Sequence, residues 1–597
     1  KLNLGDTKKS PQTSVYVSEL DITGDYKRVP EPVSIKGNKF QFVDKSIEFE
    51  NLNVNIGNFA SPQTTGFYRW KDEQLIKLSS KDTNVDLSIL FPWLSSFEII
   101  RPHLRHIESM AGSAFFSAID FAGPVSESGE WEINALGNIN KIDVKLEGFG
   151  SVMTISKAEI KSSSQDMTLS NASIQIKDSI MSAGAVLKDY FRDNLKFTMD
   201  FYGDMLADEA KLFSDYFSVP EQLNILSPVS ISASSLVVQK VPSPNSSTPN
   251  DSSISKTSNI TKEIDLNLNI VAESLGWTDS EAVTVDETKN EVESSDRNET
   301  SVSKTSLNGK VLVKSDNFKF KGFNWDTVDA EVALLGNKID VNVNEANLCG
   351  IATPGLLQVT SPTLKLEFEP FAQEEDLAKA IQCLFDKAGI ITGDFNLVGT
   401  INSDSNIVNV INSLEGELEL TSNGGRVSKY GGFARFLSGL NFGEIFRGNT
   451  NDYTDGGFPY DFITVTTDIK DGQLIIKEAA MDGPSLKIVC NGSIDLVNEK
   501  LDLQVLVIPV MAVDSVIEKI PLISTILGKD FVSIPIQVKG DFSDPKTTQL
   551  PHHSIGAGLL GIIKQTLNIP VTLVKPLDSG KKKEKAQSES SDEPSPQ

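Results

Sequence analysis

The sequence predicts a mainly β protein built from antiparallel hairpins, and three observations lead to this prediction. Apolar and polar residues alternate over many segments, as in 462–470, where Ile463, Val465 and Ile469 share one face. Turn signals such as Asp471-Gly472 separate these segments, because Asp-Gly readily adopts the positive φ of a tight hairpin. A loose repeat, in which a glycine precedes alternating apolar positions, begins at Gly309, Gly393, Gly416, Gly472 and Gly492. Each hairpin presents one apolar face that it cannot bury alone, so the hairpins must join a long sheet.

Composition excludes several functional classes. The chain has 597 residues and a formal net charge of -26. A nucleic-acid partner is therefore not expected, because phosphate backbones are bound by clustered Lys and Arg. The sequence contains no run of about 18 apolar residues that would span a bilayer. The chain begins at Lys1 without Met, so we expect that an N-terminal segment precedes it.

Four regions follow along the chain. Residues 1–240 alternate less regularly than the rest and form an N-terminal β region, with helical breaks near 87–104 and 204–216. Residues 241–305 are Ser-, Pro- and acid-rich loops around one short strand, predicted as two disordered loops. Residues 306–577 hold the regular hairpins, interrupted by amphipathic helices near 374–387, 433–446, 512–527 and 555–567. Residues 578–597 are a charged tail predicted to be disordered.

The most regular hairpins form a β-meander in the second half of the chain. After the Asp471-Gly472 turn, we expect a break at Asn491-Gly492 and a further turn at 498–500. Strands on either side of these turns place one set of apolar side chains on a common face. That predicted face consists of Ile463, Val465, Ile469, Leu486, Ile488, Leu501, Leu503, Val505 and Val507.

Residues suited to catalysis or metal binding are scarce. His103 and His106 stand three residues apart with Glu108 nearby, but no third ligand follows. The sequence contains no P-loop, dinucleotide fingerprint or nucleophile elbow. We therefore expect no catalytic residues, no cofactor and no metal. Cys349 and Cys383 are either a disulfide, if the compartment is oxidising, or two buried thiols.

Two segments carry a family resemblance. Residues 393–448 pair Gly-led strands with a Leu-Glu-Gly-x-Leu-x-Leu strand and a helix ending in Leu-Asn. Residues 462–509 follow with paired strands and a Gly-x-Ile-Asp-Leu hairpin. Together with 517–540 and 545–576, they resemble the AsmA family, specifically the AsmA-like C-terminal domain of the larger YhdP-like envelope proteins. The resemblance covers about 305–577, and the N-terminal 235 residues match in style only.

The resemblance implies both a shape and a function. Related bridge-like lipid-transfer proteins bend a long antiparallel sheet into a repeating β-groove with an apolar floor. The implied function is non-enzymatic: lipid binding, and phospholipid transport between the inner and outer membranes, by a periplasmic protein anchored in the inner membrane through an N-terminal segment absent from this chain. A closed sandwich is the alternative shape. The alternative function is that of a periplasmic scaffolding factor that assembles outer-membrane proteins through strand edges.

The last predicted helix, 555–567, has two interpretations. It either caps an edge of the sheet or touches a membrane surface. The residues that would make the membrane contact are Leu559, Leu560, Ile562 and Ile563.

Overall fold

The computed structural model describes most of the chain. The described residues are 14–43, 45–70, 74–98, 100–125, 130–190, 195–216, 223–242, 260–278, 305–320, 322–386, 389–406, 409–427, 457–484, 486–509, 533–541, 545–551, 559 and 561–562. The predicted loops around 241–305 fall largely outside these residues, and the tail 578–597 and the predicted helices at 433–446 and 512–527 fall wholly outside them. The described part is mainly β, as the alternation predicted.

The chain forms two compact units, which divide at Phe368. Unit 1 contains residues 1–368 and 404–408, and unit 2 contains 369–403 and 409–597. The boundaries predicted at 240 and 305 were drawn from composition and stay predictions.

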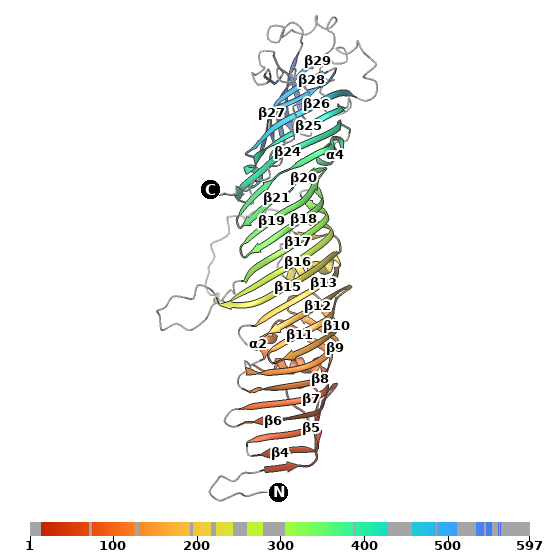
Figure 1. Ribbon diagram of the computed structural model, residues 1–597, viewed down its shortest axis with the longest axis vertical. Helices are drawn as coiled ribbons and strands as arrows, with labels where there is room; N and C mark the ends of the chain where they lie inside the picture. Colours follow the sequence, from red (N-terminus) through yellow and green to blue (C-terminus); the bar gives the residue numbers. More distant parts are fainter. Residues whose placement is uncertain are drawn as a thin grey trace, which may run out of the picture. The chain divides into compact units, whose positions relative to one another are not determined.

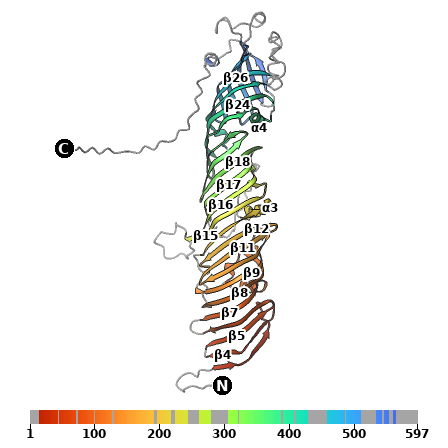
Figure 2. The same ribbon diagram turned by 45° about the vertical axis from the view of Figure 1, so that its right-hand side comes forward.

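Unit 1 is a ladder of strands in nearly sequential order (Figure 1). Its strands are β1 (Ser14–Val17), β2 (Leu20–Gly24), β3 (Val33–Gly37), β4 (Lys39–Val43), β5 (Ser46–Ile56), β6 (Phe59–Arg69), β7 (Leu75–Asp86), β8 (Ile107–Pro124), β9 (Glu132–Leu146), β10 (Val152–Ser163), β11 (Asp166–Ile176), β12 (Ser179–Lys188), β13 (Lys196–Met205), β14 (Leu223–Ile225), β15 (Val229–Pro242), β16 (Ile260–Trp277), β17 (Thr305–Phe320), β18 (Phe323–Leu335), β19 (Lys338–Leu348), β20 (Ile351–Ala352), β21 (Gly355–Thr360) and β22 (Thr363–Phe368). From β4 to β13 each strand pairs antiparallel with the next, and Figure 2 shows the same succession from a second side.

One pair departs from the predicted antiparallel order. β16 and β17 run parallel over their whole lengths, from Lys262 opposite Thr305 to Trp277 opposite Phe320. A parallel pair needs a long crossover in place of a tight turn. The short strand predicted within 241–305 is β16, and the polar stretch of sequence between Trp277 and Thr305 supplies the length that a parallel crossover needs.

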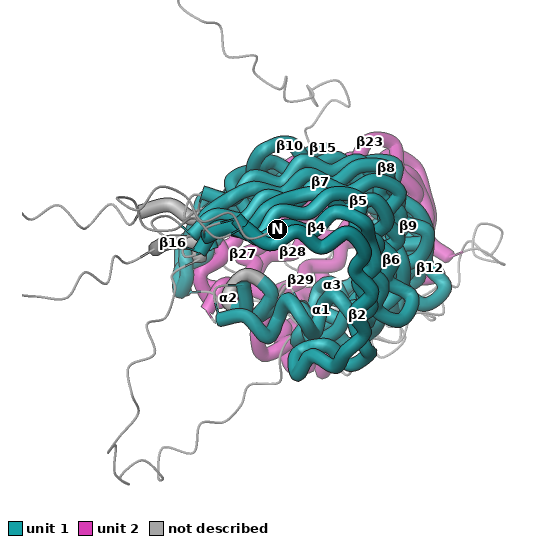
Figure 3. The backbone as a smooth tube through the Cα atoms, turned by 90° about the horizontal axis from the view of Figure 1, so that it is seen from below, with its two compact units in different colours: residues 1–368, 404–408 teal, residues 369–403, 409–597 magenta. Residues whose placement is uncertain are grey.

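The sheet of unit 1 bends at irregularities in the middle of its strands. Register shifts occur between β5 and β6 near Leu52, between β11 and β12 before Ala172, and between β15 and β16 after Ala233. Several coincide with positive φ, as at Asn51 and Asn171. Bulges of this kind bend a strand and increase its twist. Seen from below in Figure 3, the strands of unit 1 follow an arc, with the helices on its concave side.

The helices of unit 1 lie in two of the connections between strands, one after β7 and one after β13. α1 (Leu87–Ser95) and α2 (Arg101–Leu104) link β7 to β8, and α3 (Ala207–Tyr216) follows β13. These confirm the helical breaks predicted near 87–104 and 204–216. α1 begins at Asp86, whose carboxylate accepts a hydrogen bond from the Ser88 backbone N–H at 2.9 Å. Such a cap satisfies one of the free donors at a helix start.

Unit 2 is an antiparallel sheet in sequential order. It contains β23 (Phe371–Asp376), α4 (Leu377–Phe385), β24 (Ile391–Asn406), the 3₁₀ turn Ile411–Ser413, β25 (Glu415–Val427), β26 (Phe458–Lys470), β27 (Gln473–Asp482), β28 (Leu486–Asp495), β29 (Lys500–Pro509), β30 (Ile534–Asp541) and β31 (Lys546–Gln549). α4 confirms the helix predicted near 374–387. Like α1 it starts at an aspartate, Asp376, which accepts from the backbone N–H groups of Ala378 and Lys379.

Two of the three expected breaks in the meander are turns. Asp471 and Gly472 have φ values of 51° and 72° and join β26 to β27. The turn before Lys500 joins β28 to β29. The break at Asn491-Gly492 was wrong, because both residues lie inside β28. Gly492 has a φ of 138°, and a Cβ there would overlap the carbonyl oxygen of Asp502 on β29, so this glycine serves close strand pairing.

The other repeat glycines serve close approach as well. Gly309, Gly393 and Gly416 all lie within strands. Added Cβ atoms at Gly309 and Gly416 would overlap backbone oxygens of Leu266 and Thr400. At Gly393 the obstacle is the Tyr460 phenol, whose Oη donates to the Thr392 carbonyl at 2.7 Å. Of the five repeat glycines, only Gly472 lies at a turn between two strands.

Candidate functional site: the apolar face of the sheet

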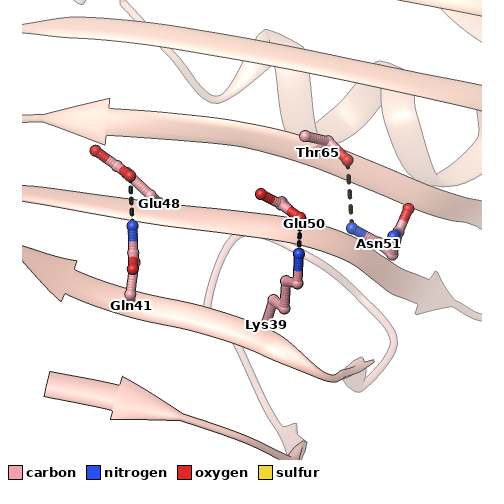
Figure 4. A network of polar contacts seen from close by, with 6 residues as sticks. All are labelled: Lys39, Gln41, Glu48, Glu50, Asn51 and Thr65. Atoms are coloured by element: carbon pink, nitrogen blue, oxygen red, sulfur yellow. Dashed lines mark hydrogen bonds and ion pairs between the residues drawn. The ribbon is translucent and has the colours of Figure 1, made fainter.

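The two faces of the sheet in unit 1 differ sharply in chemistry. One face carries cross-strand ion pairs, including Lys310 with Glu331 at 2.7 Å and Lys314 with Asp329 at 2.8 Å. Hydrogen bonding to Lys314 lowers the pKa of the Asp329 carboxyl from its usual value. Figure 4 shows the same polar chemistry on β4 and β5, where Lys39 pairs with Glu50 at 2.6 Å.

The opposite face is apolar and open over the last strands of unit 1. Successive cross-strand partners on β17, β18, β19, β21 and β22 form a continuous row, Val311, Val332, Val341, Leu357 and Leu366, and Val313 and Val343 lie beside it as partners of Ala330. We call these seven residues the apolar lane. All seven side chains are only partly buried. Residues next to them in sequence, such as Lys310 and Asn342, are exposed on the other face, which also carries the exposed side chains of Leu312 and Leu356.

Partial burial of the apolar lane argues against a closed sandwich at this place. Facing sheets pack about 10 Å apart and interdigitate their side chains, which buries inner positions. Among the described residues of unit 1, all strands belong to one sheet, and none forms a second layer. The lane therefore keeps contact with solvent or with a ligand, and each CH₂ group covered by a ligand would contribute about 0.8 kcal/mol.

Elsewhere in unit 1, protein covers more of the apolar face. Seven buried residues on β8 to β12 form a floor: Ala114, Ile139, Ile142, Val144, Ala158, Ala172 and Ala183. α3 covers a neighbouring area, where Phe149 contacts the rings of Phe213 and Tyr216 at centroid distances of 5.3 and 5.6 Å. The apolar face thus alternates between stretches covered by helices and stretches left partly exposed.

The face predicted in the meander of unit 2 is only partly open. Ile488, Val505 and Val507 lie together in a buried cluster, and Ile463 and Leu503 pack against it. Of the remaining predicted residues, Ile469 is buried, Val465 and Leu501 are partly buried, and the side chain of Leu486 lies outside the described residues. Their function as a lipid-contacting face stays a proposal, and the partly exposed members are those that a ligand could reach.

The C-terminal segment covers the other face of the same strands. Leu559 and Ile562 are 2% and 6% exposed and pack with Ala480, Val489 and Leu506. The two residues thus pack on a face of the sheet, and both the edge cap and the membrane contact stay predictions. Leu560 and Ile563 lie outside the described residues.

The cysteines fall into two states. Cys349 and Cys383 are disulfide-bonded, and Cys490 is a free thiol. Burial raises the pKa of the Cys490 thiol to about 12. A protonated, buried thiol is a poor nucleophile.

The described residues hold no group of side chains suited to a metal ion. Nowhere in this part of the chain do three or more His, Cys, Asp or Glu side chains gather in an arrangement suited to a metal ion. An open depression of about 560 Å³ lies on the polar face of β9 to β11, lined by residues such as Lys141, Thr154 and Lys177. In the same described part, none of the helices has the length and apolarity needed to cross a bilayer.

Sequence reasoning missed the apolar lane of unit 1 and the bulges that bend the sheet. The signal for the lane was present, since Val311 and Val313 alternate directly after Gly309. The bulges had no such signal, because residues such as Asn51 and Thr327 adopt positive φ inside strands without any nearby glycine.

The fold and this face together define a protein built on a continuous β-sheet, with ion pairs on one face and the apolar lane on the other over β17 to β22. Residues 305–547 match the family model described as YhdP protein. This confirms the resemblance to YhdP-like proteins, and that part of the chain is a YhdP-like region. No curated protein matches the chain.

Proposed function

We propose that this chain is a non-enzymatic lipid-binding protein of the bacterial envelope, and that it conducts phospholipid between the inner and outer membranes. The observation that carries the proposal is the apolar lane of unit 1. Seven neighbouring aliphatic side chains remain partly exposed on one face, while ion pairs occupy the other. Acyl chains favour such a face, and a head group stays in water along its open side.

The YhdP-like match supports the proposal from a second direction. The match covers 305–547 and so includes the strands that carry the lane. We further propose a periplasmic location with an inner-membrane anchor in a segment outside this chain. The disulfide-bonded state of Cys349 and Cys383 fits an oxidising compartment.

The lane is tested by comparing two adjacent substitutions. Val341→Asp places a carboxylate on the apolar face, whereas Asn342→Asp places the same group on the exposed opposite face. We expect phospholipid that co-purifies with the protein, measured by mass spectrometry, to fall at least about tenfold in V341D, because burying a charge under an acyl chain is costly. N342D should retain wild-type lipid.

Two results would contradict the proposal. Repeated absence of lipid from the folded wild-type protein would remove the lipid function. Capture of an outer-membrane protein by crosslinking, without any lipid, would favour the scaffolding alternative.

A further inference from the structure

The connection between β7 and β8 combines an apolar helix with basic side chains. α1 is apolar except for Ser88 and Ser95, which lie seven residues apart on one side, and only Ile89 is buried. Leu90, Phe91, Trp93 and Leu94 remain partly exposed. α2 follows with Arg101, and Arg105 comes directly after it, both exposed. Aromatic and basic residues placed next to each other are typical of sites where lipid tails meet head groups.

Two arginines converge on one aromatic residue of this connection. The guanidinium of Arg28 lies 4.8 Å from the centroid of the Phe97 ring. The backbone N–H of Arg101 donates to the Phe97 carbonyl at 2.9 Å, and its side-chain Nε donates to the Ser95 carbonyl at 3.1 Å. Arg28 and Arg101 are therefore held on the same short segment, 95–101.

These arginines have no acidic partner among the residues that the structure describes. Two nearby acids are engaged elsewhere: Asp86 caps α1, and Glu108 pairs with Lys145 at 2.7 Å. Asp25 and Glu31, three residues to either side of Arg28, are exposed and form no ion pair with it. Glu98, the third acid of the segment, is exposed between the two helices. In a chain of net charge -26, two adjacent unpaired arginines form a local site for an anion.

Two orphaned donors lie in the same helix. The Ser95 Oγ and the Trp93 Nε1 are buried, and neither has a hydrogen-bond partner in the described part of the chain. Buried polar atoms are nearly always paired, so an atom without a partner calls for an acceptor. Ser95 is also the residue whose backbone carbonyl accepts the hydrogen bond from Arg101 Nε. A hydroxyl beside a guanidinium is a donor set suited to a phosphate oxygen.

We propose that this segment binds the phosphate of a single phospholipid, with Arg28, Arg101 and the Ser95 hydroxyl as its partners. The acyl chains lie against the exposed apolar side chains of α1 on the concave side of the arc in Figure 3. The inference rests on the proposed lipid function and adds to it a head-group site, located outside the YhdP-like region.

The test compares one pair of arginines with one pair of lysines. Arg28→Gln with Arg101→Gln removes two charges from the site, and Lys157→Gln with Lys161→Gln removes two from exposed positions of β10. Each protein is loaded with a fluorescent phosphatidylglycerol, which is then displaced by unlabelled phosphatidylglycerol, by diacylglycerol with the same chains, or by glycerophosphate. Circular dichroism and thermal unfolding verify that both variants fold.

The wild type should bind phosphatidylglycerol about tenfold more tightly than diacylglycerol, the factor that corresponds to about 1.4 kcal/mol from a charge-assisted hydrogen bond. The arginine variant should lose this preference while still binding diacylglycerol, and the lysine variant should keep it. An unchanged preference in the arginine variant would overturn the site and leave the lipid function standing. Displacement by glycerophosphate as efficient as by phosphatidylglycerol would instead assign the arginines to free phosphates and overturn the lipid site. Failure of the wild type to bind either lipid would count against the proposed function itself.

Discussion

Single residues decide where helices leave the sheet and which groups stay reactive. Asp86 begins α1 and lies buried between β7 and the helix. Burial alone would raise the pKa of its carboxyl, but hydrogen bonds from Ser88, from the Asn58 side chain and from Ile89 outweigh this effect. The pKa therefore lies below its usual value of 3.8.

Two substitutions of Asp86 should distinguish the contribution of helix capping to stability from that of the carboxylate charge. Asp86→Ala removes the cap and should lower the free energy of unfolding of unit 1 by about 1 kcal/mol. Asp86→Asn keeps a capping oxygen without the charge and should cost less. Because the folded-state pKa is lowered, the stabilisation from the charge is present above pH 3.8 and is lost as the pH falls below it. Denaturant titrations of wild type and D86N at several pH values should therefore converge in acid; a constant difference would contradict the assignment.

The three cysteines should react in a graded manner. In the native protein a maleimide should label no cysteine, because Cys349 and Cys383 are bonded and burial raises the pKa of Cys490 to about 12. Unfolding without reductant should expose one thiol, and unfolding with reductant should expose three. Intact-mass measurement counts the labels. Three labels without reductant would show that the disulfide is absent.

At the scale of elements, glycines fix how closely strands approach. A Cβ on Gly66 of β6 would overlap the Lys77 carbonyl oxygen on β7, whereas a Cβ on Gly24 of β2 would meet nothing within 4 Å. We expect Gly66→Ala to destabilise unit 1 by about 1–3 kcal/mol, since the neighbouring backbone must move. Gly24→Ala should change the stability by less than about 1 kcal/mol. Thermal unfolding of the two variants provides the comparison, and equal effects would contradict it.

The C-terminal segment is the element whose function is most directly testable. Leu559 and Ile562 pack on β27 to β29, so changing both to Ala should lower the stability of unit 2 by more than about 2 kcal/mol. If the segment is a cap, the intact chain and a chain lacking 551–577 should show equal flotation with liposomes. Flotation that depends on 551–577 would instead establish the membrane contact.

The sequence predicted most elements but not their geometry. Alternation identified the hairpins, and Asp471-Gly472 identified a turn, because both signals depend on neighbouring residues. It did not distinguish a turn glycine from one inside a strand, since Gly492 and Gly472 have similar local contexts and differ only in what the adjacent strand requires. Of the predicted apolar face of β26 to β29, five residues (Ile463, Ile488, Leu503, Val505 and Val507) belong to one cluster with side chains of β30, and this burial could not be read from the local sequence.

At the scale of each whole unit, stability is a sum of neighbour terms. Long-range pairing in unit 1 joins strands that follow one another closely in the chain, apart from the crossover between β16 and β17. Surface ion pairs such as Lys39 with Glu50 are exposed and contribute little each. The folded state therefore depends on strand pairing and on an apolar face that includes both buried and partly exposed side chains.

Because each strand pairs with its neighbours in the chain, the number of strands in the sheet can change. β11 and β12 form one hairpin, Asp166–Lys188, between β10 and β13. Removing this hairpin would place β10 next to β13, and these two strands would still be antiparallel. The sheet would become shorter by two strand-to-strand distances, about 9.6 Å. Gain or loss of hairpins would thus change the length of such a sheet in steps of two strands, while the pairing of the remaining strands stays the same.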